Sequence, residues 1–105
     1  MSTMDERRGA AETKLMLNAE QEFKAEARRN KMLAQWAAPL AGRSDVDAYV
    51  LEVIKSDFEE AGDEDVLRKV GADLAAGGAG VTDQELRAKM DELMDLAKEQ
   101  IHTGT

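Results

Sequence analysis

The sequence predicts an all-α protein, a four-helix bundle preceded by an N-terminal tail that is flexible and only transiently helical. Four segments repeat apolar residues at helical spacing, and capping residues, proline or glycine separate them. No stretch alternates apolar and polar residues as a half-buried strand does. The 105 residues amount to one domain, which we divide into a tail at 1–18 and a bundle at 19–105.

The first helix is expected from about Ala19 to Ala38. Its apolar residues recur at helical spacing and are Phe23, Ala27, Leu33, Trp36 and Ala37. Pro39 disfavours helical geometry at the residue before it, so the helix should stop at Ala38.

The second helix is expected to begin at Ser44, because a serine cap with an acid three residues later, here Asp47, is a helix start signal. One wide apolar face follows, made of Val46, Tyr49, Val50, Val53, Ile54 and Phe58. Gly62 should end this element, and Asp63 can cap the next one.

The third and fourth helices are separated by glycines. The third apolar face consists of Val66, Leu67, Val70 and Leu74, and Gly77-Gly78 should end that helix. The residues from Thr82 to Glu85 fit a capping box, so a fourth helix should start there. Its stripe consists of Leu86, Met90, Leu93, Met94, Ala97 and Ile101.

Residues 1–18 carry too little apolar surface to fold alone. A continued helix would present only Met4, Ala11 and Leu15 on its stripe, and Gly9 costs about 1 kcal/mol relative to alanine. Burying the stripe would contribute about 4–6 kcal/mol. Ordering each of about fifteen residues costs about 1–2 kcal/mol before helix hydrogen bonds offset part of it. Such a tail can fold on a partner, or it is simply a frayed terminus.

The charge distribution argues against nucleic-acid binding. The net charge is −8, and residues 45–65 alone hold nine acidic residues and one basic residue. The basic cluster at 24–31 is short, with a local charge of +3. A nucleic-acid binder usually needs a basic footprint, so we expect none, and we expect the two charge blocks to face each other within the fold.

No catalytic residue, metal ligand or cofactor is expected, and hence no enzyme. There is no cysteine, and the single histidine, His102, lies near the C-terminus. The run from Asp57 to Asp65 begins like a calcium loop but has Ala61 at the fifth and Arg68 at the twelfth position, so we interpret it as a turn between helices. Gly77 to Gly80 lacks the sequence context of a phosphate loop.

The expected compartment is the cytoplasm. The N-terminus has no long apolar run, so we expect neither a signal peptide nor a membrane-spanning helix. The absence of cysteine fits a reducing compartment.

Several strings, spread over nearly the whole chain, are specific enough to indicate a family. The first is F-K-A-E-A-R-R-N-K at 23–31, followed by W-A-A at 36–38. Others stand at 57–60, 62–66, 68–70, 87 and 89–93. On these strings the chain resembles the alphaproteobacterial zeta subunit family, which are inhibitor proteins of the F-type ATP synthase.

The resemblance implies a four-helix bundle whose partner is the catalytic head of the membrane-bound ATP synthase, with no membrane insertion of its own. It also implies that the tail folds as a helix between a catalytic alpha/beta pair and the central stalk and blocks ATP hydrolysis. Rotation in the synthesis direction should push the tail out, so the block is one-way. The bundle is then the anchor and the tail the effector, which folds where a groove supplies the missing apolar surface.

The resemblance places the partner-binding residues in the tail. They are Met4, Asp5, Arg7, Arg8, Ala11, Glu12, Lys14 and Leu15. The family usually carries aromatic residues where Met4, Ala11 and Leu15 stand here, and Gly9 also departs from its pattern. If each aromatic residue of the family fills a pocket of the partner, their loss weakens docking of the tail. We therefore expect weak inhibition or another use of the same fold.

A nucleotide-sensing or small-ligand module is the alternative function. Trp36 can stack on a base, and Arg28 and Arg29 can meet phosphates in a cleft between helices. We favour the simpler interpretation, in which Trp36 belongs to the core and the arginines pair with the acidic block. A regulatory adaptor with an unrelated partner is a third hypothesis.

Overall fold

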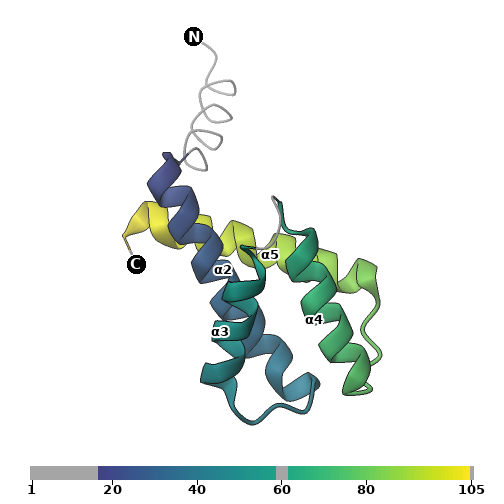
Figure 1. Cartoon of the computed structure of the whole chain (residues 1–105). Helices are drawn as coiled ribbons and strands as arrows, with labels where there is room; N and C mark the ends of the chain where they lie inside the picture. The colour runs from purple at the N-terminus through teal and green to yellow at the C-terminus, as the bar shows by residue number, and fades with distance from the viewer. Residues whose placement is uncertain (1–16, 59–61, 105) are drawn as a thin grey trace.

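The computed structural model describes residues 17–58 and 62–104, and within these ranges the chain forms helices and no strand (Figure 1). The helices are α2 (Ala19–Leu40), α3 (Val46–Ser56), α4 (Glu64–Ala76) and α5 (Asp83–Thr103). The prediction of an all-α protein with four helices is confirmed. Residues 1–16, which make up most of the predicted tail, lie outside the described residues.

Helix α2 is the central element of the fold. Its most extensive contacts are with α5 and α3, and it also contacts α4. Figure 1 shows α3 running beside α2, with α5 crossing them and α4 completing the group. The core between the helices consists of Leu33, Ala34, Ala37, Ala38, Tyr49, Val50, Val53, Val66, Val70, Leu74, Leu86 and Met90. None of the described helices is both long and apolar enough to cross a lipid bilayer.

Helix α2 starts where the sequence predicts but ends later. The side chains of Asn18 and Gln21 form a capping box, in which each accepts a hydrogen bond from the other's backbone N–H. The expected end at Ala38 is wrong, because the helix continues through Pro39 to Leu40. A proline in the last turn removes only one hydrogen bond, and Gly42, with a φ of 76°, is the residue that lets the chain leave the helix.

The expected cap of α3 is also wrong in detail. The N-cap residue is Asp45 instead of Ser44, and its side chain makes no capping hydrogen bond. Its carboxylate instead accepts hydrogen bonds from Arg43 at 3.0 and 3.1 Å. Helix α3 ends at Ser56, well before Gly62, and the Ser56 hydroxyl donates to the Val53 carbonyl oxygen at 2.7 Å.

The boundaries between α4 and α5 agree with the prediction. Helix α4 ends at Ala76, directly before Gly77. At the start of α5 the Glu85 N–H donates to the Thr82 hydroxyl at 3.0 Å, and the Thr82 N–H donates to the Glu85 carboxylate at 2.9 Å. The predicted capping box is therefore confirmed.

Gly77 allows two backbones to touch. A Cβ atom placed on Gly77 would lie 2.7 Å from the backbone of Ala41, at the point where the end of α4 meets the end of α2. The φ of Gly77 is −83°, which any residue can adopt, so the requirement for glycine is one of space.

Gly77→Ala should therefore lower the free energy of unfolding, by about 1–3 kcal/mol, because the backbone of α2 must move away. Gly71→Ala is the matched control. Gly71 lies inside α4, and a Cβ there would meet its nearest neighbours at an ordinary 3.6 and 3.7 Å. That change should raise stability by up to about 1 kcal/mol through helix propensity. Urea unfolding followed by circular dichroism measures both, and equal effects of the two substitutions would contradict the contact.

Candidate partner-binding surface

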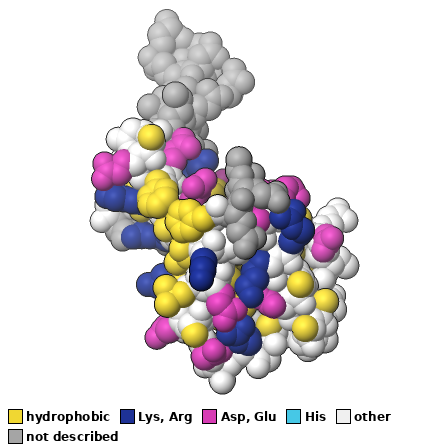
Figure 2. Space-filling model, in the orientation of Figure 1, with side chains coloured by type: hydrophobic (Ala, Val, Ile, Leu, Met, Phe, Trp, Pro, Cys, Tyr) yellow, Lys and Arg dark blue, Asp and Glu magenta, His cyan; other side chains and the backbone are white. Residues whose placement is uncertain are grey.

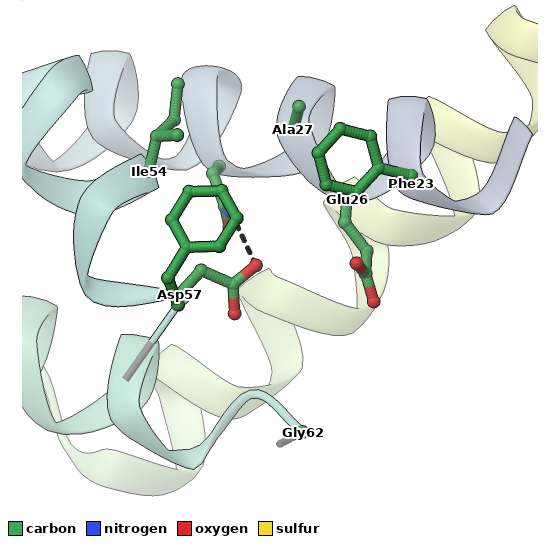
Figure 3. A pocket seen from close by; sticks show the side chains of 8 residues that line it. Phe23, Glu26, Ala27, Ile54, Asp57 and Gly62 are labelled. Atoms are coloured by element: carbon green, nitrogen blue, oxygen red, sulfur yellow. Dashed lines mark hydrogen bonds between the residues drawn. The ribbon is translucent and has the colours of Figure 1, made fainter. Parts of the chain in front are cut away.

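A hollow of about 250 Å³ lies between α2 and α3. Phe23, Glu26, Ala27 and Asn30 line it from α2, and Ile54, Asp57, Phe58 and Gly62 line it from α3 and the residues that follow. Figure 3 shows Phe23, Glu26 and Ala27 on the wall formed by α2, and Ile54 and Asp57 on the facing wall.

Two aromatic rings at this hollow are exposed to solvent. Phe23 is 57% exposed and Phe58 is 68% exposed, although sequence periodicity placed both on apolar helix faces. Figure 2 shows hydrophobic side chains gathered on this face of the molecule, with basic side chains beside them. Contiguous exposed apolar surface of this kind is typical of sites that bind another molecule.

A buried arginine, Arg29, contacts two of the residues that line the hollow, Asn30 and Asp57. Arg29 is only 1% exposed, and its guanidinium lies 4.0 Å from the Asp57 carboxylate and 3.7 Å from the Asp63 carboxylate. Its Nε donates a hydrogen bond to Asn30 Oδ1 at 2.7 Å, and Asn30 Nδ2 donates to Asp57 Oδ2 at 2.9 Å. The end of α3 and the start of α4 are thereby both tied to α2.

Asp63 extends this ion pairing to the last helix. It is the N-cap residue of α4, as expected, but its side chain makes no capping hydrogen bond. It instead accepts a hydrogen bond from Arg87 Nη1 at 2.9 Å, and Arg87 also pairs with Glu64. In the run whose start resembles a calcium loop, Asp57, Asp63 and Glu64 thus form ion pairs between helices.

The acids that line the hollow have raised pKa values. Burial raises the pKa of the Asp57 carboxyl group, and this outweighs the hydrogen bond from Asn30 and the charge of Arg29. Burial also raises the pKa of Glu26, and the Asp57 carboxylate adds to the rise. Glu26 as a whole residue is exposed, but the walls of the hollow displace part of the water around its carboxyl group. Both carboxyl groups are therefore only partly hydrated.

A second polar cluster lies at the other end of α3 and is structural in character. Glu52 accepts hydrogen bonds from Arg43 at 2.6 Å and from Lys69 at 2.9 Å, and these two, Arg43 first, lower its pKa to about 2. The Tyr49 hydroxyl donates to Asp73 at 2.9 Å. This cluster joins the loop before α3 to α4.

The residues proposed for nucleotide contact do not converge. Arg29 is taken up by the buried ion pairs, as our favoured interpretation of it predicted. Arg28 donates to Gln100 at 3.2 Å. Trp36 packs partly buried against the core, with the Lys89 ammonium group 5.5 Å from its ring centroid. Arg28 and Trp36 line different hollows, so the nucleotide module stays a prediction without a formed cleft.

The other sequence-predicted sites are placed as follows. The tail residues Met4, Asp5, Arg7, Arg8, Ala11, Glu12, Lys14 and Leu15 lie outside the described residues. His102 is exposed in the last turn of α5. Across residues 17–58 and 62–104, no group of three or more potential ligands is arranged to hold a metal ion.

The apolar hollow is the feature that sequence reasoning missed. Periodicity assigned Phe23 and Phe58 to apolar faces, but it does not reveal that nothing among the described residues covers them. A signal was present in the acidic neighbours of both rings, since Glu22 and Glu26 flank Phe23 and Asp57 precedes Phe58. Acids this close to an apolar residue are more typical of a rim than of a core.

The described part of the chain is a group of four helices with a largely apolar hollow that has an acidic border. Comparison with known proteins specifies it further. The family model for ATPase inhibitor subunit zeta matches residues 1–100, so the chain belongs to this family. It is also similar to a chain in a solution NMR structure, with a TM-score of 0.68 and 48% sequence identity over 80% of this chain and 98% of that chain. A search of curated proteins gave no match.

The raised pKa of Glu26 predicts a pH-dependent effect of Glu26→Gln. A raised pKa means that the native state disfavours the carboxylate, so the neutral variant should be more stable at pH 7. The difference should shrink as the pH falls through the raised value and vanish below 4.5, the ordinary pKa, where the native side chain is neutral too.

Urea unfolding at pH 7 and at about pH 3.5 measures this difference. The control is Asp95→Asn, the same charge change on the exposed side of α5. A stability gain from Glu26→Gln that persisted unchanged at the lower pH would contradict the charge explanation.

Proposed function

We propose that this protein inhibits ATP hydrolysis by the F-type ATP synthase by inserting its N-terminal segment into the catalytic head. The observation that carries the proposal is the family match, which spans residues 1–100 and so includes the tail as well as the helices. The tail residues named above are the contact residues of this proposal, and the alpha/beta subunits and the central stalk are their partners.

The start of α2 supports a division of labour between tail and bundle. The Asn18 capping box closes the start of α2 through Asn18 and Gln21, which both lie after the tail residues 1–16. The first buried core residue is Ala25, and the main core cluster begins only at Leu33. We therefore expect the bundle to fold from residue 17 onward, so that the tail can fold on a partner.

The inhibition proposed is one-way. A tail helix held between a catalytic alpha/beta pair and the central stalk resists rotation in the hydrolysis direction. Rotation in the synthesis direction moves the stalk so that the tail is expelled. The energy for folding the tail comes from the groove of the partner, because the tail's own stripe of Met4, Ala11 and Leu15 is too small to supply it.

Removal of residues 1–16 tests this function. The shortened chain keeps Leu17 and Asn18, so the cap of α2 is intact and its unfolding temperature should hardly change. Inhibition of ATP hydrolysis by the cognate catalytic head should disappear. Asn18→Ala in the full chain is the control, because it weakens the bundle by about 1 kcal/mol while leaving residues 1–16 unaltered. Full inhibition by the shortened chain would refute the tail mechanism.

Strengthening the tail should strengthen inhibition. Gly9→Ala favours a tail helix by about 1 kcal/mol. Ala11→Phe adds an aromatic anchor, and truncation of a buried anchor commonly costs about 2 kcal/mol or more. Together the changes correspond to roughly a hundredfold in affinity if they add.

The measurement is the concentration for half-maximal inhibition of hydrolysis by the natural chain, each single variant and the double variant. The unfolding temperature of the bundle serves as the control and should stay constant. Equal potency of all four proteins would show that residues 9 and 11 do not contact the head.

A further inference from the structure

The hollow between α2 and α3 has no role in the tail mechanism. We propose that it receives a lysine or arginine side chain, carried on an amphipathic helix of the partner protein, and so anchors the bundle. The inference rests on the proposed function only in naming the catalytic head as that partner. The chemistry of the hollow, described next, specifies the side chain independently.

The walls of the hollow suit the aliphatic stem of a basic residue. Phe23, Ala27, Ile54 and Phe58 supply apolar surface on both sides, and the two exposed rings can also meet a cation through their faces. The volume of about 250 Å³ is below the range of about 300–1,000 Å³ that is usual for small-molecule sites. A single inserted side chain is therefore the better match in size.

The acidic border supplies the charge that a basic residue requires. Glu26 forms no hydrogen bond or ion pair with another described residue, and it lines the hollow together with Asp57. Arg29 pairs with Asp57 at 4.0 Å and with Asp63 at 3.7 Å, and Asp63 also pairs with Arg87 at 2.9 Å, which leaves Glu26 as the carboxylate at the hollow without an ion-pair partner among the described residues. Burial raises the pKa values of Glu26 and Asp57, and an inserted cation would favour the charged form of both carboxyl groups.

The surroundings also set the direction of the partner helix. A neighbouring hollow shares Phe23, Ala27 and Ile54 with the first one and continues toward Ile101 of α5. Its rim is basic and consists of Lys24, Arg28 and Lys31. We therefore expect the partner helix to place its basic residue against Glu26 and Asp57 and its apolar residues over Phe23. Acidic residues further along that helix would face the basic rim of the neighbouring hollow.

A second copy of this chain fits less well. Its net charge is −8, so two copies repel each other before any acidic hollow is filled. The chain's own tail carries Arg7, Arg8 and Lys14, and it is the occupant against which the experiment must discriminate.

The first experiment measures the affinity of full-length variants for the purified catalytic head. Phe23→Ala and Glu26→Gln should each raise the dissociation constant about fivefold or more, and Glu26→Gln should also reduce its dependence on salt. Maximal inhibition at saturation should not change, because the tail is intact. The first control is Leu51→Ala, because Leu51 is an apolar residue of α3 that is 68% exposed, against 57% for Phe23, and does not line the hollow. The second control is Asp95→Asn. Equal losses in controls and test variants would overturn the proposal.

The second experiment needs no ATP synthase, so it separates failure of this inference from failure of the proposed function. Butylguanidinium, titrated at millimolar concentrations, should shift the ring resonances of Phe23 and Phe58 in NMR spectra. Its uncharged analogue butylurea should not, and Glu26→Gln should reduce the guanidinium effect. No shift with butylguanidinium, or equal shifts with both probes, would overturn the inference.

The chain lacking residues 1–16 completes the test. If the hollow is open to a partner, the Phe23 and Phe58 ring resonances should be the same with and without the tail. If removal of the tail shifts both rings, the tail is the occupant, and the assignment to a partner helix is wrong.

Discussion

The buried guanidinium of Arg29 is the interaction on which the arrangement of the molecule depends. It lies on the central helix α2 and holds the end of α3 and the start of α4 through Asp57 and Asp63. Burying such a charge costs several kcal/mol unless partners surround it, so Arg29 requires Asp57 and Asp63 to lie beside it. The ion pair with Arg29 brings Asp57, and with it Phe58, opposite Phe23, and these residues line the hollow.

The two ends of α2 differ in how deeply they are packed into the core. At its C-terminal end the helix is packed into the core, with Ala37 and Ala38 buried and Ala41 against Gly77. At its N-terminal end the first core residue comes only after a capped turn, and Phe23 is exposed. Stability is thus concentrated away from the junction with the tail. In our proposal, a partner that contacts the tail and the hollow therefore leaves the core undisturbed.

The helices could be predicted from sequence because their signals are local. The apolar period, the Thr82–Glu85 capping box and Gly77 each act within a few residues. Some errors occurred where contacts between side chains decide the outcome. The Asp45 carboxylate pairs with Arg43, so Asp45 is the N-cap residue of α3 without making a capping hydrogen bond. Arg28 and Arg29 look equivalent in the sequence, but they point to different parts of the fold. Arg29 is buried, whereas Arg28 lies at the rim of the neighbouring hollow. The hollow exists because parts of the apolar faces of α2 and α3 are not covered by another described helix, and the apolar period of a sequence does not reveal which faces are covered.

In our proposal the bundle anchors the protein on the catalytic head, and the tail inhibits ATP hydrolysis. The most direct measurement is competition: the chain lacking residues 1–16 is added in excess to the catalytic head already inhibited by the full-length protein, and ATP hydrolysis is followed. The account predicts that the shortened chain displaces the full-length protein and restores hydrolysis, because both share the anchoring surface. Inhibition that persists at any excess of the shortened chain would contradict the account, since it would mean that the bundle does not bind the head.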